Sequence, residues 1–340
     1  MTIKKHALII TVLILIIALI PGCTGQETGQ ESPGQRSPQQ EETQKISIIC
    51  TIFPQYDWVR QIIGDENIDR FDVTFLISSG ADLHNFNPSV QDMTRIMTSD
   101  AFIYVGGHSD SWVDDVMRRA NPDIAKLNLM DTLIEAMGEH DLLEGFCDVD
   151  CDEEHDHSHE ETHADEHIWL SLRRAKILCS AIADLISELD PEHAQTYKEN
   201  AETYIARLTA LDAEFHIAVE SANFKTLVFA DRFPFRYLMD DYGLNHYAAF
   251  QGCSAESEAS FVTIISLANR LNQLGLNAVM VTETSDQSIA RTVINSTDAG
   301  NHKILVLHAA HSVTVSQAET GVTYLSIMRN NLETLKEAME

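Results

Sequence analysis

Short runs of apolar, β-branched residues alternate with segments of helical spacing along most of the chain. The runs predicted to be strands are residues 46–53, 73–77, 101–105 and 125–129 in the first half, and 226–229, 246–250, 278–282 and 304–307 in the second. Strands that alternate with helices predict parallel sheets. The pattern therefore predicts an α/β protein with two (β/α) lobes, and a last helix that ends at Met339.

One predicted helix in the first half has a clear start signal. Ser89 can cap it, and Asp92 can complete a capping box three residues later. The residues predicted to face inward are Val90, Met93, Ile96 and Met97.

A much longer helical pattern begins at Asp190 and Pro191, which suit a cap and a first helical position. Its apolar residues recur every three or four positions: Ala194, Tyr197, Ala201, Tyr204, Leu208, Leu211 and Phe215. At about 1.5 Å per residue such a helix spans roughly 45 Å. We therefore expect a rigid backbone helix that joins the two lobes.

The N-terminus has the pattern of a targeting segment. Lys4 and Lys5 precede an apolar run that is shorter than the roughly 20 residues of a spanning helix. The run closes on Pro21-Gly22-Cys23, which resembles a bacterial lipobox, so Cys23 is the expected lipid anchor. An uncleaved anchor helix is the alternative. Both interpretations place the rest of the chain outside the cytoplasm.

These patterns predict five parts. They are a lipoprotein signal peptide (1–23), a flexible tether rich in Gln, Glu, Gly, Ser and Pro (24–45), an N-terminal lobe (46–189), a linking helix (190–222) and a C-terminal lobe (223–340). The N-terminal lobe contains a stretch dense in Asp, Glu and His, residues 141–166, which we predict to be a mobile loop.

The net charge limits the possible binding partners, and the cysteine count limits the possible disulfides. The formal net charge of −29 argues against nucleic acid or an anionic membrane surface and favours attraction of cations. Beyond Cys23 an odd number of cysteines remains, so no complete disulfide framework is implied. Cys147 and Cys151 form the only plausible local pair.

Histidine is the main candidate for chemistry, because several of the 15 histidines lie where predicted strands end and loops begin. His84 lies in Gly80-Ala-Asp-Leu-His-Asn-Phe-Asn-Pro88, and His167 lies in Asp165-Glu-His-Ile-Trp169. The acidic loop carries four more: His155, His157, His159 and His163.

These segments resemble the zinc and manganese binding proteins of ABC importers (solute-binding protein family 9, cluster A-I). In that family the first metal ligand lies in a Pro-His-x-aromatic-x-Pro motif and the second in Asp-Pro-His-x-Trp. Leu83 and Glu166 stand here where the prolines are usual. Zinc-specific members also have a His-rich acidic loop before the second ligand. The resemblance covers residues 46–340 and implies that His84 and His167 bind metal.

The ligands implied for the second lobe depart from the family pattern. Arg232 occupies the usual position of the third ligand, and arginine stays protonated, so Asp231 is the nearest replacement. The family's last ligand is an Asp after the final strand, where this chain offers His308 and His311, and both remain open. Glu283 falls where the family also has an acid, either as a support for a ligand or as an alternative ligand.

The resemblance implies a metal-binding component of an ABC importer that captures zinc between its lobes and delivers it to a permease, without covalent chemistry. A nitrogen-rich set of ligands suits Zn²⁺ better than Mn²⁺, which prefers more carboxylate. We expect a monomer held at the membrane by its lipid. The alternatives are a manganese-binding homologue, a surface adhesin and a secreted zinc hydrolase. The hydrolase is disfavoured because the one His-Glu-x-x-His match, His159 to His163, lies in the acidic stretch predicted to be a loop and not on a helix, and no Ser or Cys nucleophile motif appears.

Overall fold

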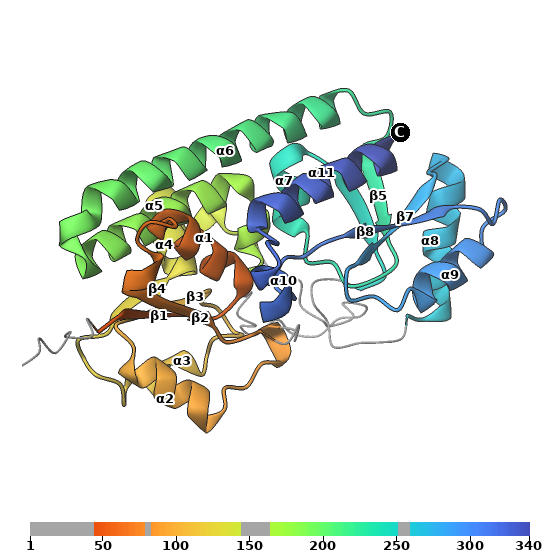
Figure 1. Ribbon diagram of the computed structural model, residues 1–340. Coiled ribbons are helices and arrows are strands. Elements are labelled where there is room, and N and C mark those ends of the chain that lie inside the picture. Colours follow the sequence, from red (N-terminus) through yellow and green to blue (C-terminus); the bar gives the residue numbers. More distant parts are fainter. Residues whose placement is uncertain (1–43, 79–82, 144–163, 251–258) are drawn as a thin grey trace, which may run out of the picture. The chain divides into compact units, whose positions relative to one another are not determined.

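The computed structural model describes residues 44–78, 83–143, 164–250 and 259–340. These residues contain two four-stranded sheets (Figure 1), in which all recorded strand pairs are parallel. The first sheet has the order β2–β1–β3–β4, with β1 Ile46–Cys50, β2 Phe71–Phe75, β3 Ala101–Tyr104 and β4 Ala125–Asn128. The second has the order β6–β5–β7–β8, with β5 Thr226–Phe229, β6 Asn245–Ala248, β7 Ala278–Thr282 and β8 Lys303–Leu307. The predicted α/β fold with two lobes is confirmed.

The two sheets share one strand order, although the sequence shows no repeat. In each, the first strand lies inside the sheet, and the second and third strands of that lobe pair with its two sides. The chain therefore adds its second strand on one side of the first strand and its third strand on the other side. Parallel sheets tend to bind ligands at such a switch point, at the carboxyl ends of the strands. His84, Glu283 and His308 all follow strands at such ends.

Helices cover the sheets and join them. Those in the first lobe are α1 Phe53–Ile63, α2 Val90–Thr98, α3 Val113–Met117, α4 Leu129–Met137 and α5 Leu172–Leu189. The long α6 spans Ala194–Glu220. The second lobe has α7 Arg236–Tyr242, α8 Phe261–Leu274, α9 Ser288–Asn295, α10 Val315–Glu319 and α11 Tyr324–Met339. The last helix ends at Met339 as predicted.

Several predicted details of the first lobe differ from the structure; the strand predicted over 73–77, for example, spans Phe71–Phe75. The strand predicted over 46–53 ends at Cys50, because the chain turns into α1, which begins at Phe53; Gln55 on α1 accepts the Thr51 N–H at 2.8 Å. The capping box of α2 is present, but Val90 is 77% exposed, since it lies in the first turn, beyond the contact that buries Ile96.

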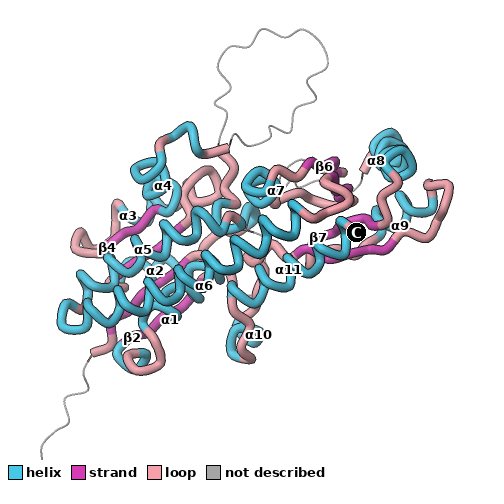
Figure 2. The backbone as a smooth tube through the Cα atoms, turned by 90° about the horizontal axis from the view of Figure 1, so that it is seen from above, coloured by secondary structure: helices cyan, strands magenta, loops and turns pink. Residues whose placement is uncertain are grey.

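The long helix begins three residues later than predicted. A 3-10 turn, Pro191–His193, precedes α6, and Asp190 instead accepts hydrogen bonds from Arg70 and from the Tyr197 hydroxyl. The predicted apolar stripe is buried from Tyr197 to Phe215. With 27 residues α6 is about 40 Å long. It contacts α1 and α5 of the first lobe and α7 and α11 of the second, and Figure 2 shows it beside α11.

One contiguous apolar core extends through both lobes. It includes Ile48 and Trp58 in the first lobe, Leu211 on α6, and Phe229 and Met328 in the second. Separating the lobes would expose this core to water, which costs roughly 25 cal/mol per Å² of apolar surface. We therefore expect the lobes to move little relative to each other. No described helix is long and apolar enough to cross a membrane.

A buried ion pair also joins the lobes. Arg174 on α5 donates to the Asp241 carboxylate on α7 at 3.1 Å, and both side chains are nearly inaccessible, at 3% and 9% exposure. The Arg174 guanidinium lies over the ring of Tyr237, 4.3 Å from its centroid. Burial raises the pKa of Asp241, while Ser171 and Arg174 act in the opposite direction.

Asp57 should make the stability of the fold depend on pH. Burial raises its pKa to about 6, although the Tyr324 N–H donates to its carboxylate at 2.9 Å. Because the unfolded pKa is about 3.9, the folded chain binds more protons between pH 4 and 6, so this group's contribution to stability falls as pH rises through that window.

We expect the Asp57→Asn variant to lack this trend. Over that pH range the free energy of unfolding of the wild type should fall, relative to the variant, by at most about 3 kcal/mol. Urea unfolding of both proteins from pH 4 to pH 7 measures the difference. A difference that does not change with pH would contradict the assignment.

Candidate metal site

His84 and His167 face each other in the first lobe. His84 lies in the 3-10 turn η2, Leu83–Asn85, and His167 immediately precedes the turn η4, Ile168–Leu170. Their Nε2 atoms are 3.2 Å apart. Two nitrogens bound to one tetrahedral zinc at 2.0–2.1 Å lie about 3.3 Å apart. The pair is therefore spaced as two ligands of one ion would be.

The imidazole of His167 is oriented by the residue two positions before it. Asp165 accepts from both the backbone N–H and the Nδ1 of His167 through Oδ1, each at 2.9 Å. Burial by itself would raise the pKa of Asp165, but His167 and Arg236 hold it below its ordinary value. An ionised carboxylate at Nδ1 leaves Nε2 as the nitrogen directed at His84.

His84 is held by two residues that the motifs did not identify. The Ser109 hydroxyl lies 2.8 Å from His84 Nδ1, and Glu166 Oε2 lies 3.5 Å from the same atom. The Ser109 N–H donates to Glu166 Oε1 at 2.9 Å. The one sequence signal for these contacts was that Glu166 stands at a position where the family usually has proline.

His311 of the second lobe lies next to this pair. It is buried, and its ring centroid is 6.3 Å from that of His167 and 5.9 Å from that of Trp169. The Trp169 indole N–H donates to the Ala309 carbonyl at 2.8 Å, which ties the loop after β8 to the segment that carries His167.

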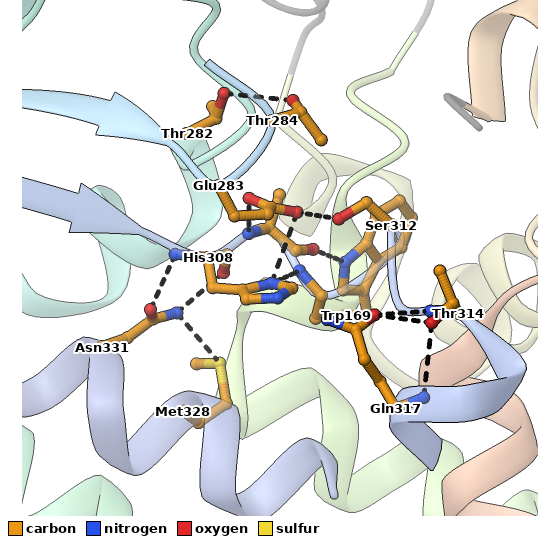
Figure 3. Close-up of polar contacts among 12 residues, drawn as sticks. Trp169, Thr282, Glu283, Thr284, His308, Ser312, Thr314, Gln317, Met328 and Asn331 are labelled. Atoms are coloured by element: carbon orange, nitrogen blue, oxygen red, sulfur yellow. Dashed lines mark hydrogen bonds and ion pairs between the residues drawn. The ribbon is translucent and has the colours of Figure 1, made fainter. Parts of the chain in front are cut away.

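His308 makes its hydrogen bonds and its ion pair within its own lobe (Figure 3). Its Nδ1 accepts the Ala310 N–H at 2.9 Å and lies 3.3 Å from Glu283 Oε1, while its backbone exchanges hydrogen bonds with Asn331. Burial lowers the pKa of His308, against the opposite effect of Glu283. While Nδ1 accepts the Ala310 N–H, the proton of a neutral ring is on Nε2, so Nε2 would bind a metal only with the proton moved to Nδ1, beside Glu283.

Glu283 braces the loop between His308 and His311. Its carboxylate accepts the Ala309 N–H at 2.9 Å and the Ser312 hydroxyl. Ala310 has a φ of 67°, a left-handed conformation that is uncommon for a residue with a side chain. The contacts of Glu283 on both sides of Ala310 hold the strained backbone in place (Figure 3).

Asp231 makes its contacts with the end of β7 and with its own neighbour. Its Oδ2 accepts from the N–H and the hydroxyl of Thr282, at 3.0 and 2.8 Å, and its Oδ1 accepts the Arg232 N–H at 2.8 Å. In the parts of the chain that the structure covers, no group of three or more His, Cys, Asp or Glu side chains is arranged to hold an ion. The loop histidines His155, His157, His159 and His163, together with Cys23, Cys147 and Cys151, lie outside the described residues.

The chain is similar to zinc-binding proteins of known name. It is 31% identical over 295 residues to the zinc-binding protein AdcA of Streptococcus pyogenes serotype M6, covering 86% of this chain and 56% of that protein. It is 28% identical over 295 residues to the high-affinity zinc uptake system protein ZnuA of Bacillus subtilis, covering 87% and 88%. The chain thus spans about half the length of the streptococcal relatives it matches.

Solved structures share the fold. The metal-dependent lipoprotein YcdH of Bacillus subtilis superposes with a TM-score of 0.70 at 24% identity, covering 87% of this chain and 100% of that one. Zn(II)-bound AdcA of Streptococcus pneumoniae gives 0.68 at 26% identity, covering 87% and 58%. The model of the family described as "zinc-uptake complex component A periplasmic" (ZnuA) matches residues 48–338, so the chain belongs to this family.

Proposed function

We propose that this protein is the extracytoplasmic zinc-binding component of an ABC importer, which captures Zn²⁺ between its lobes and passes it to a permease. The observation that carries the proposal is the facing pair of Nε2 atoms of His84 and His167, 3.2 Å apart. A carboxylate lies beside the Nδ1 of each ring, as is usual for histidines that bind metal. The names of the relatives agree with zinc as the cargo.

We assign His84, His167 and His311 as the first three ligands. His311 joins the set because its ring lies beside that of His167, and a small movement of the loop after β8 would bring it to a shared ion. The fourth ligand comes from His308 through Nε2, or from Glu283 if zinc displaces one of its present donors. Asp231 is left out of this assignment, because its carboxylate holds Thr282 and the Arg232 N–H instead of the loop that carries His308 and His311.

The remaining parts of the proposal follow the sequence. A lipid on Cys23 would hold the monomeric protein outside the cytoplasm, close to its permease. The acidic His-rich loop would concentrate cations and supply a weak second site. No covalent chemistry is part of the proposal, because four protein ligands leave zinc no open position at which to activate water.

Competitive titration of the metal-stripped chain from residue 46 with zinc and manganese tests this function. We expect one tight zinc site that survives deletion of residues 152–163, with the deletion affecting only the capture rate or a weak second site. Weak binding that disappears with the loop would contradict the proposal. Tighter binding of manganese than of zinc would identify the alternative cargo.

Zinc should also stabilise the fold by binding only the folded chain. At a free zinc concentration 1,000 times the dissociation constant, the gain in the free energy of unfolding is about 4 kcal/mol. Thermal unfolding with and without zinc measures it, with magnesium as a control, because magnesium prefers oxygen ligands. Equal stabilisation by both metals would point to a nonspecific effect of charge.

A further inference from the structure

The two facing histidines are each served by one of two consecutive carboxylates. Asp165 contacts the Nδ1 of His167, and Glu166 contacts the Nδ1 of His84. Both carboxylates are 6% exposed, so they act at short range with little screening by water. The first contact is local, whereas the second joins residues that are far apart in the sequence.

Glu166 is part of a closed ring of contacts with His84 and Ser109. Its Oε1 accepts the Ser109 N–H at 2.9 Å, the Ser109 hydroxyl lies 2.8 Å from His84 Nδ1, and Glu166 Oε2 lies 3.5 Å from that same nitrogen. Because the Glu166 carboxylate contacts both Ser109 and His84, rotation of the His84 imidazole would disturb the contacts among all three residues.

The backbone before Ser109 leaves space for this carboxylate. Gly107 has a φ of +78°, and a Cβ at this position would lie 2.6 Å from Glu166 Oε1. A side chain at position 107 would therefore displace the carboxylate as well as strain the turn. His84 itself lies on a short 3-10 turn rather than a long element, so its ring needs outside contacts to keep one orientation.

We propose that Glu166 is a positioning residue for zinc binding, which together with Ser109 fixes the ring of His84 so that Nε2 faces His167. The Nδ1 of His84 then donates its proton to the Ser109 hydroxyl, and the charge of the Glu166 carboxylate, 3.5 Å from Nδ1, increases the donor strength of Nε2. This inference rests on the proposed zinc function and adds two residues to the machinery of that site.

The Glu166→Gln variant of the full-length, metal-stripped protein tests this role. An amide can still accept the Ser109 N–H through its oxygen, but it then presents an NH₂ group to the Nδ1–H of His84. We expect about a tenfold or larger loss of zinc affinity, with the unfolding temperature of the metal-free protein unchanged. The visible absorption of bound Co²⁺ should also change, because the donor geometry around the metal differs.

Two further variants make the test decisive. Ser109→Ala should weaken zinc binding in the same way, and the double variant should lose less than the sum of the two effects, because both residues act on one ring. Glu188→Gln, on the exposed face of α5, is the matched control and should bind as the wild type does.

The outcomes separate this inference from the proposed function. If the wild type and all variants bind zinc equally tightly with the same Co²⁺ spectrum, the role of Glu166 is refuted while the zinc function stands. If Glu166→Gln loses affinity only together with its folded stability, the residue is structural and the inference fails. If the wild type binds no zinc tightly, both are overturned.

Discussion

Replacing both His84 and His167 with alanine is expected to lower zinc affinity by on the order of 100-fold or more, with at least about tenfold from each single change. The pair supplies the two donors whose spacing already matches a tetrahedral zinc, so the double variant keeps only the ligands of the second lobe. Removing His167 also leaves the Asp165 carboxylate buried without its imidazole. Competition against a zinc chelator of known affinity measures the loss.

His140→Ala is the control for this experiment. His140 also belongs to the first lobe, but its side chain is 84% exposed. The His140→Ala variant should therefore bind zinc as tightly as the wild type does. Unchanged tight binding in the double variant would refute the assignment of the site, and an equal loss in the control would show that affinity depends on the number of histidines and not on their geometry.

Arg174→Ala is expected to cause the largest loss of stability, about 3–5 kcal/mol in the free energy of unfolding. The change leaves the Asp241 carboxylate buried without its cation, and it removes the guanidinium stacked on Tyr237. Because the pair joins α5 to α7, the contact between the lobes should weaken with it. Urea unfolding at neutral pH measures the loss.

The matched control is Arg329→Ala, which breaks the ion pair with Glu214 between α11 and α6. The side chains of Arg329 and Glu214 are 50% and 42% exposed, so water screens the pair. The free energy of unfolding should therefore fall by less than about 1 kcal/mol. Similar losses in the two variants would show that the burial of Arg174 adds nothing to the strength of its contact.

Most elements of the fold could be predicted from the sequence, because buried parallel strands are continuous apolar runs and long helices have strong periodicity. The bounds of β5 and β7 were predicted to the residue. Errors arose at the ends of elements, which an apolar run does not mark by itself. Helix α1 begins at Phe53 inside the first apolar run, and Asp190 binds Arg70 instead of capping α6.

The residues of the candidate site also fall into those that the sequence could predict and those that it could not. His84 and His167 stand in local motifs, which a single sequence can display. Glu166 and Ser109 act through a contact between residues 57 positions apart, which no local pattern encodes. The choice between His308 and His311 stayed open because it depends on how the loop after β8 turns. Glu283 and the left-handed Ala310 determine that turn, in which the His308 backbone bonds Asn331 and its ring contacts Glu283.

The contact between His84 and His167 joins residues 83 positions apart, and that between Trp169 and Ala309 joins residues 140 positions apart. Contacts of such long sequence separation form late, because closing long loops costs entropy before the contact is gained. We therefore expect that a partly folded chain cannot assemble the pair of imidazoles and the loop beside it. Tight retention of zinc would then be a property of completely folded molecules only, and zinc content could be used to count them.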